Sequence, residues 1–122
     1  MANVPDDGLS HLRVTLSDTA YIGPGRADLM ELIEQTGSIT AAGKAMGMSY
    51  KRAWSLVQAL NEGFGQVLVE TSRGGSAQGG AHLSAAGKAV LGHYRAMQDK
   101  TRAAIAGDVA ALRKIIDMSR RK

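Results

Sequence analysis

The chain has 122 residues, a mass of 12.8 kDa, 44% apolar residues and a formal net charge of +4, which suits one compact domain with a single hydrophobic core. It contains no cysteine, so disulfides and thiolate metal sites are excluded and a reducing, cytoplasmic location is expected. No apolar run approaches the ~20 residues of a membrane span, and the N-terminal segment is acidic, so neither a membrane anchor nor a signal peptide is expected.

Positive charge is unevenly distributed along the chain. Residues 1–34 contain two Lys or Arg against six Asp or Glu, whereas residues 35–107 contain eight against three and residues 108–122 five against two. Residues 35–61 and 71–98 contain no carboxylate. A surface that faces a phosphate backbone requires such stretches, because a carboxylate there would repel the phosphates. Charge alone is equally compatible with scattered, solvated Lys and Arg.

The first predicted elements are a short strand and a helix. Residues 12–16 alternate apolar and polar side chains, which is the period of a half-buried strand. Gly23-Pro24-Gly25 then breaks the chain and starts a helix near Arg26, because proline is favoured at the start of a helix. This helix ends at residues 36–37, and its apolar face consists of Leu29, Leu32 and Ile33.

Residues 39–56 have the pattern of a helix-turn-helix. A first helix is predicted to end at Met46 and a second to run over residues 50–62, with Ser38 and Ser49 as their N-caps. The apolar positions that the two crossed helices must bury are Ala42, Met46, Met48, Ala53 and Leu56.

Two glycines serve this motif. Gly47 follows the first helix, where a residue that tolerates positive φ turns the chain at low cost. Gly43 is small at the point where the second helix crosses closely over the first.

The rest of the chain predicts a β-hairpin and helices. Strands near 66–71 and 81–83 flank a glycine-rich tip. Ser84 is expected to cap a long helix through Ala106, after which Gly107-Asp108 interrupts it before a last amphipathic helix. The apolar stripes of these two helices consist of Val90, Tyr94, Met97, Thr101, Ala104 and Ile105, and then Val109, Leu112, Ile115 and Ile116. Their spacing suits helix pairing, packing on the chain's own domain, or both.

The order of elements indicates a winged helix-turn-helix: a mainly α fold with a small β wing and a long C-terminal helix. We divide it into an N-terminal segment with a short strand (1–19), a winged helix-turn-helix DNA-binding domain (20–84) and a C-terminal helical region for dimerisation (85–122).

The second helix of the motif carries the candidate DNA contacts. At 100° per residue, Lys51, Ser55 and Gln58 point away from the buried direction, with Arg52 on one flank and Tyr50 and Trp54 on the other. Trp54 either stacks on sugar-phosphate or seals the core, and the sealing role is favoured. A solvated face is the alternative for the cations. The predicted DNA-binding residues are Lys44, Ser49, Tyr50, Lys51, Arg52, Ser55, Arg73, Ser76, Gln78 and His82.

Other chemistries find no support in the sequence. Gly43-Lys44 and Gly87-Lys88 have Ser38 and His82 where a P-loop needs its first glycine. The three histidines have neither metal-ligand nor triad spacing, so no enzyme, metal site or cofactor is expected.

At residues 49–54 (SYKRAW) and 68–83 (LVETSRGGSAQGGAHL) the chain resembles the N-terminal DNA-binding domain of molybdate-dependent transcriptional regulators, the ModE family. The resemblance covers about residues 20–98, and the same architecture gives a looser similarity to LysR-type regulators. The shared frame also includes Gly37-Ser38-Ile39, Ala42, Lys44, Gly47, Asn61 and Gly87.

This resemblance implies a homodimeric transcription factor that binds a palindromic operator in double-stranded DNA. The chain stops about 24 residues after the match, so the molybdate-binding region of full-length members is missing and molybdate binding is not carried over. We therefore predict a sequence-specific DNA-binding regulator. The alternatives are a non-specific architectural DNA-binding protein and a winged-helix adaptor that binds another protein.

Overall fold

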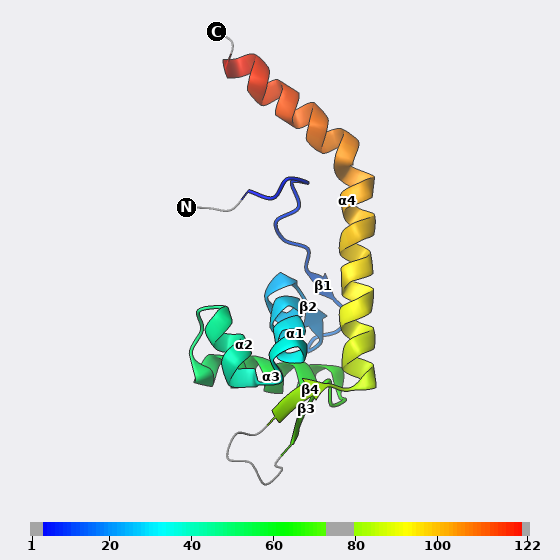
Figure 1. Ribbon diagram of the computed structural model, residues 1–122. Coiled ribbons are helices and arrows are strands. Elements are labelled where there is room, and N and C mark those ends of the chain that lie inside the picture. Colours follow the sequence, from blue (N-terminus) through cyan, green and yellow to red (C-terminus); the bar gives the residue numbers. More distant parts are fainter. Residues whose placement is uncertain (1–3, 73–79, 121–122) are drawn as a thin grey trace.

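The computed structural model describes residues 4–72 and 80–120. Figure 1 shows a small helical body, a two-stranded wing at one end and a long helix that leaves the body on one side. The mainly α winged helix-turn-helix fold is confirmed. The elements are β1 (Val14–Thr15), β2 (Tyr21–Ile22), α1 (Pro24–Thr36), α2 (Ile39–Ala45), α3 (Tyr50–Phe64), β3 (Val69–Ser72), β4 (Gly80–Leu83) and α4 (Ala85–Arg120).

The helix-turn-helix forms as its local signals predict. The Ser38 Oγ accepts a hydrogen bond from the Ala41 N–H at 3.0 Å, and the Ser49 Oγ accepts one from the Arg52 N–H at 3.1 Å, so both serines are N-caps. Gly47 has φ 72°, the left-handed conformation that the turn requires. These caps and the turn set the direction in which α3 leaves α2.

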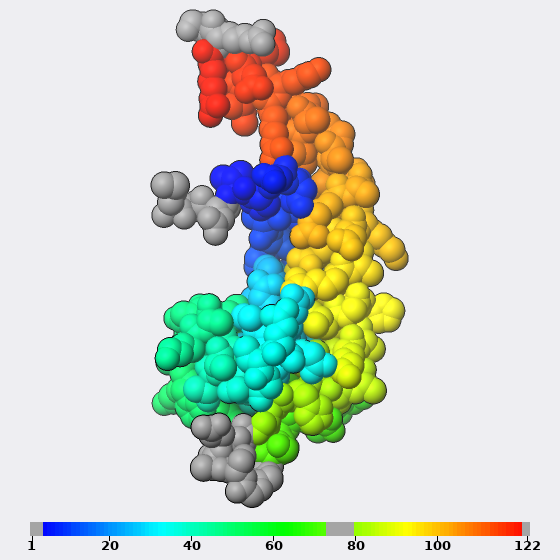
Figure 2. Space-filling model, viewed as in Figure 1, coloured from blue at the N-terminus to red at the C-terminus, as the bar shows by residue number. Residues whose placement is uncertain are grey.

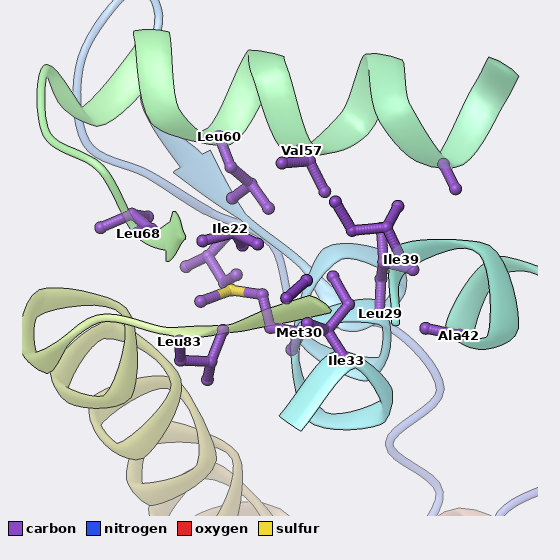
Figure 3. Close-up of a cluster of buried hydrophobic side chains, with 14 of the residues drawn as sticks. Ile22, Leu29, Met30, Ile33, Ile39, Ala42, Val57, Leu60, Leu68 and Leu83 are labelled. Carbon is purple, nitrogen blue, oxygen red and sulfur yellow. The ribbon is translucent and has the colours of Figure 1, made fainter. Parts of the chain in front are cut away.

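The core lies between α1, α3 and the strands (Figure 3). Leu29, Met30 and Ile33 of α1 face Val57 and Leu60 of α3, and all five side chains are buried. Burying an aliphatic side chain of this size stabilises the fold by about 1.5–3 kcal/mol. The core is completed by Ile22, Ala27, Ile39, Ala42, Ala53, Leu68, Val69, Ala81, Leu83 and Tyr94.

The wing is tied to α3 by one side chain. The Asn61 Oδ1 accepts hydrogen bonds from the Leu68 N–H at 2.8 Å and the Val69 N–H at 3.1 Å, while its Nδ2 donates to the Val69 carbonyl at 3.3 Å. β3 and β4 then pair antiparallel, with Val69 opposite Leu83 and Glu70 opposite His82. The base of the wing is therefore fixed to the end of α3.

The sequence prediction is wrong for the C-terminal region. Gly107-Asp108 does not interrupt the helix, because α4 continues through both residues to Arg120. A glycine weakens a helix without ending it, and a Cβ atom at Gly107 would have no heavy atom within 4 Å, so no close contact requires a glycine here. Figure 1 shows a bend of α4 in its orange part rather than a break.

Smaller differences concern the N-terminal elements. The strand expected over 12–16 is only the two residues of β1, which pair with β2, a strand that was not predicted. α1 begins at Pro24 rather than Arg26, because the fixed φ of proline fits the first helical position. No helix within residues 4–72 or 80–120 is long and apolar enough to cross a membrane.

Candidate nucleic-acid interface

The outward face of α3 consists of the predicted side chains. Ala53, Val57 and Leu60 are buried, and the opposite positions, Lys51 and Ser55, are exposed. Arg52 and Gln58 are exposed as well. α3 therefore presents its polar face to solvent along its first two turns.

The cations of this face have no internal partner. In the part of the chain that the structure describes, no carboxylate forms an ion pair with Lys44, Lys51 or Arg52. The acidic N-terminal segment, which would cancel their charge if it lay here, runs along α4 instead (Figure 2). The opening turn of α3 is available to an anionic partner.

The carboxylates of α1 are neutralised on the other side of the molecule. Arg95 of α4 forms ion pairs with Asp28 at 2.9 Å and with Glu31 at 3.0 Å. Partial burial alone would lower the pKa of Arg95, but these two hydrogen-bonded carboxylates raise it, so the guanidinium stays charged. Negative charge is thus held at the α1–α4 contact, away from α3.

Glu34 is a further carboxylate of α1 with partners inside the protein, and it links α1 to the wing. Its Oε1 accepts a hydrogen bond from the Leu83 N–H at 3.0 Å, and its Oε2 lies 3.6 Å from the Lys88 Nζ. The hydrogen bond from Leu83 and the charge of Lys88 lower the pKa of this carboxyl from its ordinary value. Glu34 therefore fixes β4 against α1 and carries a compensated charge.

Tyr50 and Trp54 form an aromatic pair at the flank of α3. Their ring centroids are 6.1 Å apart and the rings are inclined at 64°, an edge-to-face arrangement. Tyr50 is 58% exposed, whereas Trp54 is half-buried and packs against the core. The favoured sealing role of Trp54 agrees with this packing.

A cleft of about 970 Å³ opens beside this pair, between the start of α2, the start of α3 and the base of the wing. The described residues that line it include Lys44 and no carboxylate. Sequence reasoning did not select the hydroxyl side chains that line it, because they come from three separate elements: Thr36, Ser38, Thr40, Thr71 and Ser72.

The wing contributes one described candidate. His82 is exposed on β4, and its Nε2 lies 2.9 Å from the Oε1 of Glu70, directly across the hairpin. This carboxylate immediately precedes the acid-free stretch and already occupies one nitrogen of His82. The other predicted wing contacts, Arg73, Ser76 and Gln78, lie outside the residues that the structure describes.

The interface has the chemistry of a binding surface. Across residues 4–72 and 80–120, no group of three or more His, Cys, Asp or Glu side chains could hold a metal ion. What the structure brings together is a set of cations, hydroxyls and aromatic rings: Lys44, Ser49, Tyr50, Lys51, Arg52 and Ser55 with the lining of the cleft.

Comparison with known proteins places the fold. Residues 27–88 match the model of the bacterial regulatory helix-turn-helix proteins of the lysR family. The crystal structure of the CbnR_DBD–DNA complex superposes on the chain with a TM-score of 0.56 and 27% identity, covering 71% of this chain and 95% of that one.

Two relatives have similar sequences. The molybdenum-pterin-binding protein MopB of Rhodobacter capsulatus is 42% identical over 76% of this chain and 35% of its own length. The transcriptional regulator ModE of Yersinia pestis is 36% identical over 68% of this chain and 32% of its own length. The chain thus spans about a third of these relatives. Because the family model matches residues 27–88, half of the chain, the protein belongs to the lysR family of bacterial regulatory helix-turn-helix proteins.

Proposed function

We propose that the protein is a sequence-specific DNA-binding transcriptional regulator, rather than an enzyme, that reads double-stranded DNA with α3. The observation that carries the proposal is the exposed opening turn of α3, where Lys51 and Arg52 have no carboxylate partner among the described residues. The similarity to the CbnR_DBD–DNA complex and to the regulator ModE supports it. A protein with this function would bind chromosomal DNA in the cytoplasm.

Within this proposal, α3 lies in the major groove. Lys51 and Ser55 face the base edges, since recognition helices present the side chains of their first turns to the bases. Arg52 and Lys44 flank this face and bind phosphates, which fixes the register of the protein on the duplex. Ser49 uses its oxygen as the acceptor of the N-cap, and its O–H remains a donor for a phosphate.

The cleft beside Tyr50 and Trp54 provides the path of one DNA strand. A phosphodiester backbone requires hydroxyl donors and positive charge, and the cleft offers Thr40, Ser72 and Lys44 without a carboxylate. The exposed Tyr50 side chain lines the same space and is available to pack on a sugar. The strand that leaves the major groove would cross here toward the wing.

We also propose that the regulator acts as a homodimer through α4. Four large apolar side chains near its end are 50–69% exposed: Leu112, Ile115, Ile116 and Met118. At 100° per residue, Leu112, Ile115 and Ile116 continue the stripe that packs Tyr94 into the body, so a second copy of the same helix is the partner whose stripe matches them. Two recognition helices held about 34 Å apart would meet successive major grooves of one palindromic site.

The test is a selection of bound duplexes followed by competition. The purified protein should enrich a palindromic sequence, and a random duplex should compete for it poorly. Binding should weaken steeply with salt, because phosphate contacts release counterions. Equal competition by random DNA would instead indicate a non-specific architectural protein, and absent or salt-insensitive DNA binding would refute the proposal.

The adaptor alternative makes a different prediction. If the domain binds another protein, charge reversal at Lys51 and Arg52 leaves its binding largely intact, whereas DNA binding should be lost. Molybdate does not enter the proposal, since the chain spans only about a third of the relatives whose names mention molybdenum.

A further inference from the structure

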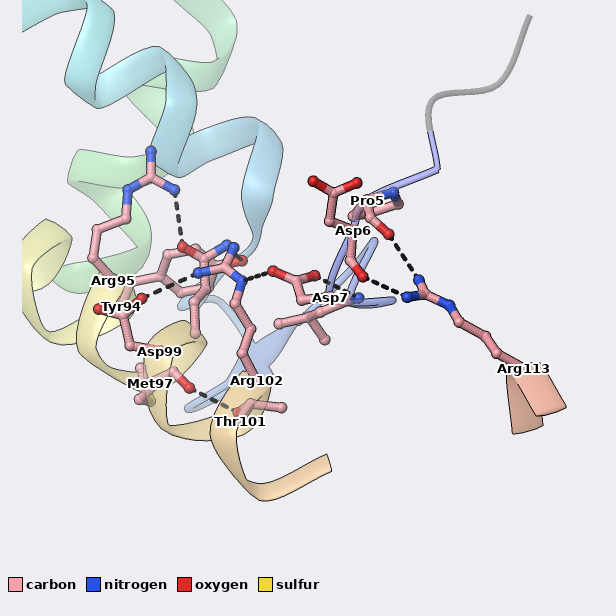
Figure 4. A network of polar contacts seen from close by, with 12 residues as sticks. Pro5, Asp6, Asp7, Tyr94, Arg95, Met97, Asp99, Thr101, Arg102 and Arg113 are labelled. Atoms are coloured by element: carbon pink, nitrogen blue, oxygen red, sulfur yellow. Dashed lines mark hydrogen bonds and ion pairs between the residues drawn. The ribbon is translucent and has the colours of Figure 1, made fainter. Parts of the chain in front are cut away.

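A short N-terminal segment, residues 4–9, crosses from the body to α4; we call it the N-terminal arm (Figures 2 and 4). We call the part of α4 that follows Gly107, residues 108–120, distal α4. The Asp7 Oδ2 forms an ion pair with the Arg102 Nε at 2.6 Å. The Arg113 Nη1 donates a hydrogen bond to the Asp6 carbonyl at 2.7 Å, and the Arg113 Nη2 donates one to the Pro5 carbonyl at 3.2 Å. Residues about a hundred positions apart in sequence are thereby joined.

The arm has its own turn, which fits it to the helix. The Gly8 N–H donates to the Pro5 carbonyl at 3.1 Å, and the Asp7 Oδ1 accepts from the Leu9 N–H at 2.9 Å. Gly8 has φ 79°, and a Cβ atom there would come within 3.0 Å of Val109. A glycine at this position therefore provides both the backbone conformation and the close contact with α4.

The contacts of the arm lie on both sides of Gly107. Arg102 precedes this glycine by more than one turn of α4, and Val109 and Arg113 follow it. Glycine inside a helix is destabilising relative to alanine because its backbone is freer. Residues 110–120 are all exposed. Within this described range, the hydrogen bonds of Arg113 to the arm are the contacts that connect the helix end to the rest of the protein. The arm therefore contacts α4 on both sides of a residue that favours the helix poorly.

We propose that the N-terminal arm is a brace that fixes the direction of distal α4, with Asp7, Arg102 and Arg113 as its positioning residues. Because the proposed dimer joins its subunits through distal α4, this direction determines the distance between the two copies of α3. The arm is thereby a determinant of the half-site spacing that the protein accepts. This inference rests on the proposed function for its DNA readout, but the brace itself is measurable without DNA.

The first experiment measures the direction of α4 directly. The chain has no cysteine, so Glu62→Cys and Ala110→Cys, both at exposed positions, accept spin labels selectively. Labelled protein is diluted into unlabelled protein, and the distance distribution is recorded by pulsed EPR. We expect a narrow distribution that broadens with Asp7→Asn and with Arg113→Ala. An unchanged distribution in both variants would overturn the brace whether or not the protein binds DNA.

Asp6→Asn is the matched control. It removes the same charge at the neighbouring residue, but the contact of Asp6 with Arg113 is made by its backbone carbonyl and is retained. Its distance distribution should equal that of the parent. The methyl group that Gly107→Ala adds would contact no neighbouring atom, and alanine makes the helix stiffer. The double variant Asp7→Asn, Gly107→Ala should therefore have a narrower distance distribution than Asp7→Asn alone.

The second experiment tests the consequence for DNA. Duplexes carry two selected half-sites at centre-to-centre spacings around one helical turn, and the affinity is measured for each. Asp7→Asn should reduce the preference for the best spacing by about fivefold, the size expected of a partly exposed ion pair, and leave the affinity for a single half-site unchanged. An identical spacing profile, or binding to DNA as a monomer, would refute the role in spacing. If the parent protein does not bind a single half-site, that result would instead refute the proposed function.

Discussion

Gly43 of α2 lies directly against Ala53 of α3, so closely that a Cβ atom at Gly43 would be 2.7 Å from the Ala53 Cβ. The crossing of the two helices at this point determines how α3 is presented to solvent. Ala53 is fully buried, and Lys51 and Ser55 on either side of it in sequence are exposed. Contact between two small residues thus orients the proposed reading face.

Gly43→Ala should therefore destabilise the protein even though alanine favours helix. The added methyl group forces α2 and α3 apart, and overpacking of this kind costs about 1–3 kcal/mol. Gly92→Ala is the control, because Gly92 is exposed on α4 and its Cβ would meet no atom within 4 Å. That substitution should stabilise by about 0.5–1 kcal/mol. Urea denaturation of the two variants measures both effects, and equal midpoints would show that the crossing is looser than described.

Local signals in the sequence predict the helix-turn-helix well. The caps Ser38 and Ser49 and the turn at Gly47 depend only on neighbouring residues, and the structure confirms all three. Gly107 fails as a local signal for a helix end. A single glycine lowers helix stability without forcing a break, so the helix formers on both sides of it can continue the helix.

Features that join distant segments were not predictable from the sequence. A Cβ atom at Gly87 would lie 2.1 Å from the Leu68 carbonyl oxygen, a contact that depends on how α4 enters the body. The Glu70–His82 pair requires the hairpin register, and the cleft requires α1, α2, α3, β3 and β4 together. The arm contacts Arg102 and Arg113 across most of the chain, so no local pattern announces it.

Asn61 of α3 should be the polar residue on which the attachment of the wing depends most. Asn61→Ala removes three hydrogen bonds and leaves the Leu68 and Val69 N–H groups without their acceptor in the interior. Each unsatisfied buried group costs about 1–3 kcal/mol. Denaturation should report the loss, and amide exchange should accelerate first at Leu68 and Val69. Asn61→Asp is the partial rescue, because a carboxylate still accepts both N–H bonds, although its second oxygen then faces the Val69 carbonyl that the amide group donated to. If both variants exchange like the parent, the wing is held by other contacts.

Glu34 should make stability depend on pH in the acid range. The pKa of its carboxyl is lowered in the folded state from an ordinary value of 4.5, chiefly by the hydrogen bond from the Leu83 N–H. A group of this kind adds stability above its unfolded pKa and loses it as the pH falls through the folded pKa. The free energy of unfolding of the parent should therefore decrease below about pH 4.5 more steeply than that of Glu34→Gln. Glu62→Gln controls for the removal of one exposed carboxylate, and parallel curves for parent and Glu34→Gln would contradict the linkage.

Lys51 and Lys44 should contribute differently to DNA binding. Lys51→Ala removes the proposed base contact, so it should cost about 1–3 kcal/mol and relax the preference at one base pair. Lys44→Ala removes the proposed phosphate contact, so it should weaken binding to all duplexes alike and reduce the salt slope by about 1. Titrations of selected and mismatched duplexes at several salt concentrations separate the two effects. The same loss of specificity in both variants would show that the assignment of α3 to the major groove is wrong.

Ile116 should control assembly. It is half exposed on the apolar stripe of distal α4, and an aspartate there would place a charge in the proposed helix pair. Ile116→Asp should therefore shift the protein to monomers in sedimentation and lower its affinity for a palindrome, while its affinity for a single half-site stays the same. Ala110→Asp is the matched control: it adds the same charge at an exposed position which, at 100° per residue, lies more than 90° around α4 from Ile116. Because a helix surface charge away from a contact is nearly neutral, Ala110→Asp should remain dimeric. A parent protein that is monomeric at all concentrations, or an Ile116→Asp variant that stays dimeric, would exclude this stripe as the dimer contact.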